Sequence, residues 1–304
     1  MAVLRYPPRA RRVSSRHGIG YHDVAAASHD RSSALFLTTV SLPWYDLAEV
    51  RAANDELWRR VALRLPTHLG ARAPLELTRD EPARLQWASG RVLLSQACGY
   101  DVVISERDRL RLVATPVYRV AGSRGATYRS AVVVRRPDGR RRLEDLRDSR
   151  CVYNERWSHS GMNGLRALIA PLARNGRFFR SVEETGSHEA SLAAVRDSRA
   201  DVAAIDAVTL GLLRRHRPGA TAGLRVIAWT EPAPAPPFVT DRAADDETVT
   251  ALRSALVDTL ADRSARDVKG ALLLRGVEIL PLESYRQIAE LEARAAAEGY
   301  PRLA

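Results

Sequence analysis

The pattern of apolar and polar positions predicts strands that alternate with helices along most of the chain. Continuous apolar runs, typical of strands buried on both faces, occur at 34–40, 90–95 and 201–205. Apolar residues at helical spacing follow the first run, at Leu47, Val50, Leu57, Val61 and Leu65. This rhythm predicts an α/β fold of mostly parallel sheets flanked by helices.

The same pattern places further elements in both halves of the chain. More strands are predicted at 75–78, 112–120, 130–134, 151–153 and 224–229. More helices are predicted at 80–89, 161–175, 189–198, 207–215, 245–262 and 281–298.

Two connecting segments divide the chain into two predicted lobes. A Gly/Ser stretch at 121–125 separates two β-rich runs, and a proline-rich stretch at 231–237 indicates a stiff, extended crossing. The predicted parts are a basic, disordered extension over 1–33, an outer lobe over 34–121 with 230–304, and an inner lobe over 122–229. Two lobes joined by two crossings can close like a hinge on a ligand at the carboxyl ends of their strands.

Composition is that of a globular protein with an unusual positive charge. The 304 residues are 45% hydrophobic and 27% charged, and the net charge is +11 with Lys269 as the only lysine. Clustered arginines would indicate nucleic-acid binding, whereas scattered ones indicate solvated faces. The arginines are scattered and aromatic residues do not interleave with them, which favours solvated faces, so we expect no nucleic-acid partner.

The cysteines and the hydropathy of the chain indicate whether it is a disulfide-bonded, metal-binding, membrane-spanning or exported protein. Cys98 and Cys151 have no metal-ligand or disulfide spacing, which predicts small buried residues and neither a metal nor a cofactor. No stretch reaches the roughly 18 apolar residues of a membrane span, so none is expected. The segment 1–33 lacks the apolar core of a secretory signal, which leaves cytoplasmic residence open.

Two predicted helix starts are lined with hydroxyls and glycines, at 157–161 and 185–189. Backbone N–H groups at a helix start are unpaired and carry the positive end of the helix dipole, so Ser, Gly and His there suit an anion. The simpler alternative is N-capping, for which Ser and Gly are common. Two such starts after consecutive strands could face one ligand.

Other polar residues fit the same site. His188 could donate to an anion, and Asp206 could accept a hydrogen bond from a protonated ligand oxygen or simply cap a helix. Trp44 and Tyr45 could form the opposite wall or be core aromatics. The motifs of nucleotide binding, of serine hydrolases and of zinc proteases are missing, which favours binding without turnover and predicts no catalytic residue.

These segments resemble a known family. The stretches 158–161, 186–195 and 200–206 resemble the substrate-binding proteins of phosphate/phosphonate-type ABC importers, and 41–46 and 94–100 are similar to outer-lobe segments of that family. The resemblance implies a type II periplasmic-binding-protein fold with an oxyanion between two lobes. It implies these ligand-binding residues: Tyr45, Gln96, Tyr100, Ser158, His159, Ser160, Gly161, Ser187, His188 and Asp206.

The expected function is therefore that of the solute-binding component of an ABC importer. It would capture a small phosphate- or phosphonate-like oxyanion, act as a monomer in the periplasm, and deliver the ligand to an ABC permease. The alternative is a cytosolic enzyme or ligand sensor built on the same two-lobed fold.

Overall fold

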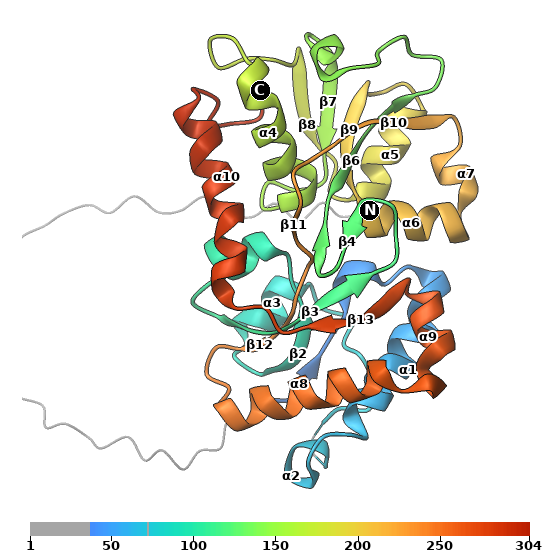
Figure 1. Ribbon diagram of the computed structural model, residues 1–304, viewed down its shortest axis with the longest axis vertical. Coiled ribbons are helices and arrows are strands. Elements are labelled where there is room, and N and C mark those ends of the chain that lie inside the picture. The colour runs from blue at the N-terminus through green and yellow to red at the C-terminus, as the bar shows by residue number, and fades with distance from the viewer. Residues whose placement is uncertain (1–36, 72) are drawn as a thin grey trace, which may run out of the picture. The chain divides into compact units, whose positions relative to one another are not determined.

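The computed structural model describes residues 37–71 and 73–304, so the predictions for 1–33 and for the start of the first strand at 34–36 lie outside the described residues. It contains two five-stranded sheets with helices around them (Figure 1), which confirms the α/β prediction. The first sheet has the order β1 (Thr39–Val40), β2 (Val92–Gln96), β12 (Phe238–Asp241), β3 (Leu110–Tyr118) and β13 (Leu274–Glu278). The second has the order β10 (Leu224–Trp229), β6 (Ser130–Arg135), β9 (Val202–Asp206), β7 (Arg150–Tyr153) and β8 (Ser181–Glu184).

Helices of very different length connect the strands. The α-helices are α1 (Arg51–Ala62), α2 (Thr67–Gly70), α3 (Ala83–Ala88), α4 (Gly164–Ile169), α5 (His188–Arg196), α6 (Ala207–His216), α7 (Pro218–Thr221), α8 (Asp246–Ala261), α9 (Arg266–Ala271) and α10 (Arg286–Ala297). The short 3-10 and π turns are η1 (Pro43–Tyr45), η2 (Ala48–Val50), η3 (Asp101–Ser105), η4 (Leu143–Leu146), η5 (His159–Asn163), η6 (Ala170–Leu172), η7 (Arg263–Ala265) and η8 (Leu282–Tyr285).

Both sheets are mixed in direction. In the first, β1 and β2 are parallel, whereas β12 is antiparallel to both of its neighbours and β13 is antiparallel to β3. In the second, β8, β7 and β9 are parallel, and β6 and β10 add antiparallel pairs. The predicted parallel arrangement therefore describes the part of the second sheet from which the helix starts emerge.

Strands β6 and β9 of the second sheet carry continuous apolar runs because helices cover both faces of the sheet. In β6, Val132 and Val134 face the core that contains Leu165 of α4, whereas Ala131 and Val133 face the core that contains Leu192 of α5. Successive strand residues point to opposite faces, so a strand covered on both sides must be apolar at every position. The same holds for β9.

Short strands join the two sheets. The hairpin of β4 (Ser123–Arg124) and β5 (Thr127–Tyr128) follows β3, and β11 (Ala233–Pro234) pairs with β5 on the return path from β10 to β12. The predicted Gly/Ser and proline-rich connections thus belong to one small sheet, in which β5 lies between β4 and β11. The lobe boundaries stay a prediction.

Helix α10 belongs to the cores of both sheets. Tyr285 and Ile288 at its start are fully buried in the first core, whereas Ala295 and the following Tyr300 are buried in the second. It packs on α4 beside the second sheet (Figure 1).

Several element predictions are corrected by the structure. Residues 75–78 form no strand, although the Thr78 amide donates to the Val40 carbonyl at 2.7 Å. The predicted helix 161–175 is divided into η5, α4 and η6. Pro171, which has no N–H to continue the helix, accounts for the end of α4 at Ile169. Strands β8, β12 and β13 were missed because they are short and carry charged or proline-flanked sequences.

Candidate functional site

The site is built where three parallel strands of the second sheet end side by side. Asn154 follows β7, Gly186 and Ser187 follow β8, and Asp206 ends β9. The carboxyl ends of adjacent parallel strands meet at one edge, so the segments after them converge. The backbone confirms this proximity, because the Gly186 amide donates to the Asn154 carbonyl at 2.8 Å.

The first helix start is a tight turn held by its own serine. The Ser158 hydroxyl oxygen accepts a hydrogen bond from the Gly161 amide at 3.0 Å, and the Asn163 amide donates to the Ser158 carbonyl at 3.0 Å. One π turn, η5, then leads into α4. Capping is therefore real here, and it leaves the Ser160 hydroxyl available for other partners.

The second helix start meets the first directly. Ser187 caps α5 by accepting from the Ala190 amide at 3.0 Å. His188, the next residue, places its ring Nε2 at 2.9 Å from the Ser160 hydroxyl, which in turn lies 3.3 Å from the Ser158 hydroxyl. The two helix starts predicted from the sequence thus converge, and Ser160 and His188 join them.

Asn154 also belongs to this cluster, and the sequence analysis missed it. Its side-chain oxygen is buried and has no hydrogen-bond partner among the described residues, as is also true of His188 Nδ1. A Cβ added at Gly161 would lie 1.8 Å from that oxygen and 3.2 Å from His188 Cε1. With the Asn154 oxygen in this position, only a residue without a Cβ fits at 161. Gly161 therefore makes room for the Asn154 side chain.

Tyr45 reaches this edge from the first sheet. Its hydroxyl donates to Asp206 Oδ2 at 2.9 Å, while Asp206 Oδ1 caps α6 by accepting from the Val208 and Thr209 amides at 2.7 and 2.9 Å. Burial raises the pKa of Asp206 to about 6 against the opposing effect of these hydrogen bonds, and burial with the nearby carboxylate raises the pKa of Tyr45. The bond joins η1, which follows β1 of the first sheet, to the end of β9 in the second.

His159 is fully enclosed at the same junction. Its amide donates to Cys98 Sγ at 3.4 Å, its Nδ1 lies 3.3 Å from the Asn163 side-chain nitrogen, and its ring centre lies 6.2 Å from that of Tyr128. Burial lowers the pKa of His159 to about 4, and the same cause lowers the pKa of His188 to about 4. Both rings are therefore neutral at pH 7.

Gln96 and Tyr100 lie at the junction with their polar groups occupied. The Gln96 amide nitrogen donates to the Tyr118 hydroxyl and to the Pro236 carbonyl, each at 3.0 Å. The Tyr100 hydroxyl donates to Glu292 at 2.6 Å, and its ring centre lies 6.3 Å from that of Trp157, which is 40% exposed. Their roles as ligand contacts stay predictions, as do those of the other predicted site residues.

Trp44 and Tyr45, for which a core role was the alternative, both pack against the first core. Trp44 stacks on Trp87 with ring centres 6.4 Å apart, and Tyr45 meets the Tyr118 ring edge-on at 5.2 Å. Behind Tyr45 and Gln96 lies a cavity of about 20 Å³. A space of this size holds on the order of one water molecule.

The described residues contain no helix with the length and apolar character needed to cross a membrane. Cys98 and Cys151 are both free and buried, as predicted, and burial raises the pKa of the Cys98 thiol to about 12.

Solved structures share this fold at low sequence identity. A binding protein component of an ABC phosphonate transporter from Pseudomonas aeruginosa is similar with a TM-score of 0.69 at 16% identity, covering 88% of each chain. PhnD1 from Prochlorococcus marinus, in complex with methylphosphonate, gives 0.69 at 13%, covering 86% of this chain and 98% of its own. XAC2383 from Xanthomonas citri, bound to ATP, gives 0.64 at 18%, covering 86% and 98%. These likenesses confirm the predicted two-lobed fold.

The sequence itself matches a family model over residues 47–285, most of the chain. No curated protein matches it. The match includes both helix starts, Asp206 and the crossings between the sheets, but begins just after Tyr45. The chain belongs to the family of periplasmic substrate-binding proteins of phosphonate ABC transporters.

Proposed function

We propose that this protein captures a small oxyanion of the phosphonate or phosphate class between its two lobes, without turnover, and delivers it to an ABC permease. The observation that carries the proposal is the convergence of two helix starts through the 2.9 Å contact of Ser160 with His188. Membership of the phosphonate-binding family supports the ligand class.

The donor chemistry suits an anion with several oxygens. Each helix start presents backbone N–H groups at the positive end of a peptide dipole, and Ser158, Ser160 and Ser187 add hydroxyls beside them. His188 is neutral at pH 7 and donates from one ring nitrogen. A bound anion favours the protonated ring, so ligand binding would raise the pKa of His188.

The ligand would enter by an opening of the lobes. Several bonds now join them at the site, including Tyr45 to Asp206 and the His159 amide to Cys98. The two neighbouring crossings, at 119–129 and 230–237, form the natural hinge. When the lobes open, the Ser158 and Ser160 hydroxyls give up their contact with each other and donate to the oxygens of the ligand instead.

Replacing Ser160 by Ala is expected to weaken oxyanion binding about tenfold, because a hydrogen bond to a charged ligand contributes on the order of 1.5 kcal/mol. Titration calorimetry with methylphosphonate, inorganic phosphate and sulfate measures the loss. Ser149→Ala is the matched control, because that hydroxyl is buried in the same lobe and donates only to the Leu146 carbonyl. If the wild-type protein binds none of these oxyanions, the proposal is wrong.

Replacing Tyr45 by Phe is expected to destabilise the closed state by about 1.5 kcal/mol, because Asp206 loses a buried hydrogen-bond donor. Ligand affinity should then fall about tenfold, with faster release. Stopped-flow fluorescence of Trp157, which lies beside Tyr100 of the other lobe, measures the release rate. Tyr153→Phe removes a hydroxyl from β7 as the control. An unchanged release rate in Tyr45→Phe would contradict a role of this bond in closure.

A further inference from the structure

A basic pocket lies away from the inter-lobe site, beside β3 and the end of β12 in the first sheet. It has a volume of about 480 Å³ and is bounded by η3, the start of β3, the chain after β12, α8 and η8. That volume falls in the range of roughly 300–1,000 Å³ usual for small-molecule sites. None of the residues that form the inter-lobe site lines it.

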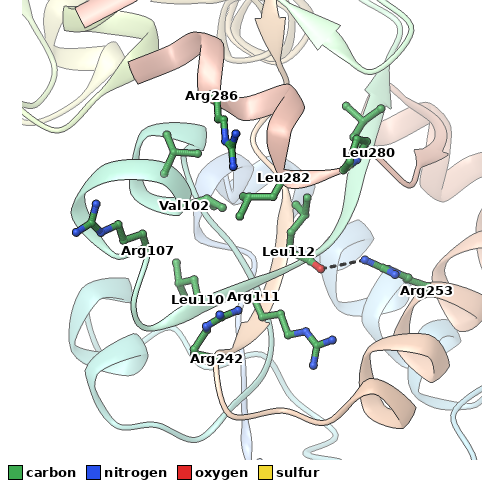
Figure 2. A pocket seen from close by; sticks show the side chains of 12 residues that line it. Val102, Arg107, Leu110, Arg111, Leu112, Arg242, Arg253, Leu280, Leu282 and Arg286 are labelled. Atoms are coloured by element: carbon green, nitrogen blue, oxygen red, sulfur yellow. Dashed lines mark hydrogen bonds between the residues drawn. The ribbon is translucent and has the colours of Figure 1, made fainter. Parts of the chain in front are cut away.

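The lining combines two kinds of side chain. Val102, Leu110, Leu112 and Leu282 supply an apolar floor, with arginines at its margins (Figure 2). These arginines are Arg107, Arg111, Arg242, Arg253 and Arg286. No acidic residue in the described part of the chain lines the pocket.

Two of the arginines have no carboxylate partner among the described residues. Arg253 on α8 is partly buried, and its guanidinium is held by the carbonyls of Val113 and Leu112 at 2.9 and 3.3 Å (Figure 2). Carbonyls orient a guanidinium without neutralising it, so Arg253 keeps its full charge and one nitrogen free. Arg242 is exposed and makes no side-chain hydrogen bond or ion pair within residues 37–71 and 73–304.

The other three arginines pair with carboxylates that lie outside the pocket lining. Arg107 contacts Asp108 at 3.7 Å, Arg286 contacts Glu283 at 3.4 Å, and Arg111 binds Asp246. All three carboxylates are exposed. Exposed ion pairs of this kind contribute about 0–1 kcal/mol, so they exchange easily for a ligand oxyanion.

We infer that this pocket is a second ligand site, which takes an amphipathic organic phosphate: an apolar body on the Val and Leu floor, and a phosphate monoester bound by the arginines at its margins, of which Arg242 and Arg253 are free of carboxylate partners among the described residues. The guanidinium fork matches the geometry of phosphate oxygens and donates to two of them at once. The five arginines and the aliphatic floor distinguish this site from the inter-lobe site, where the polar groups are hydroxyls, amides and neutral histidines.

Calorimetry with 1-naphthyl phosphate tests this inference, with 1-naphthol and inorganic phosphate as the two halves of the probe. We expect the phosphate ester to bind at least about tenfold more tightly than either half, since the site uses both parts. Adenosine monophosphate and dihexanoyl phosphatidic acid carry the same phosphate monoester on a nucleoside and on a diacylglycerol. Whichever binds more tightly identifies the class of apolar group that the pocket accepts. Equal binding of naphthol and the ester would overturn the inference.

Arginine variants show whether the ester binds in this pocket. Arg242→Gln and Arg253→Gln are each expected to weaken the ester about tenfold, because each removes a charge-assisted bond. Arg199→Gln, an equal loss of charge on the second lobe, should bind as the wild type does. The Arg242 side chain is exposed and makes no hydrogen bond or ion pair among the described residues, so its variant should fold normally even if Arg253→Gln does not.

The inter-lobe site provides the opposite control. Ser160→Ala together with His188→Ala should leave naphthyl phosphate binding unchanged, whereas the Arg242 variant should leave methylphosphonate binding unchanged. If the Ser160 and His188 variant abolishes binding of the ester, the ester binds between the lobes and the second site is refuted. This outcome is independent of whether methylphosphonate binds at all.

Discussion

Lowering the pH from 7 to 4 should reduce the free energy of unfolding by about 3 kcal/mol more in the wild-type protein than in a His159→Gln variant. His159 is 3% exposed, and burial lowers its pKa from 6.5 to about 4. The unfolded chain therefore binds a proton near pH 6.5, whereas the folded protein resists it until about pH 4. Stability contributed by the neutral ring is lost as the pH falls through this window.

Other groups with altered pKa values titrate in the same pH range. The contribution of His159 is therefore obtained by subtracting the pH dependence of the variant from that of the wild type. Burial raises the pKa of Asp206 from 3.8 to about 6, and a raised carboxyl pKa makes stability fall as the pH rises from about 4 to 6. This opposing effect is present in both proteins and cancels in the difference.

Urea denaturation at pH 7 and at pH 4 measures the two free energies. His68→Gln is the matched control, because His68 lies on α2 with its side chain 55% exposed, and its variant should keep the wild-type pH dependence. Identical pH dependence in the His159 variant and the wild type would show that His159 titrates freely in the folded protein.

Replacing Gly161 by Ala should weaken methylphosphonate binding at least about a hundredfold, because it moves both helix starts at once. The new Cβ would lie 1.8 Å from the Asn154 side-chain oxygen and 3.2 Å from His188 Cε1. No Cβ atom tolerates the first distance and the second is unusually tight, so the turn or Asn154 must shift and the His188 ring must give way slightly. A misplacement of about 1 Å can cost a positioned site a factor of 10². Calorimetry measures the affinity.

A second substitution separates this steric effect from a general loss of folding. In Asn154→Ala, Gly161→Ala the severe clash with the Asn154 side chain is gone and only the 3.2 Å approach to His188 Cε1 is left, so affinity should recover to within about tenfold of Asn154→Ala alone. Gly219→Ala is the control, since an added Cβ there meets no atom within 4 Å. If methylphosphonate affinity does not recover in the double variant, the added Cβ disturbs the backbone of the turn itself and not only the packing against Asn154.

The sequence predicted the second sheet better than the first. Strand 224–229 was predicted to the residue and the β9–α6 unit almost so. For β9 the reason is that a strand covered on both faces carries a continuous apolar run. The first sheet takes β12 and β13 from distant parts of the chain, and polar residues interrupt the apolar run in each, Asp241 in β12 and Arg275 and Glu278 in β13. Residues 75–78 have β-like composition but make only one ladder-like bond.

Candidate site residues were predictable where the signal was local. The serines, Gly161, His188 and Asp206 lie at helix starts directly after strands, and this context is visible in the sequence. Their partners are not local: Tyr45 meets Asp206 across 161 positions, and the His159 amide meets Cys98 across 61. Asn154 has no signal beyond following a strand, because its importance comes from packing against Gly161.

Helix α10 limits how the two lobes can separate. Its start is held in one core by Ile288, whose carbonyl accepts from Asn163 at 2.9 Å, and its end reaches the other core through Ala295. A swing about the crossings must therefore bend this helix or pull one end out of its core. We therefore expect α10 to oppose a wide separation of the lobes, so that only small opening angles are reached.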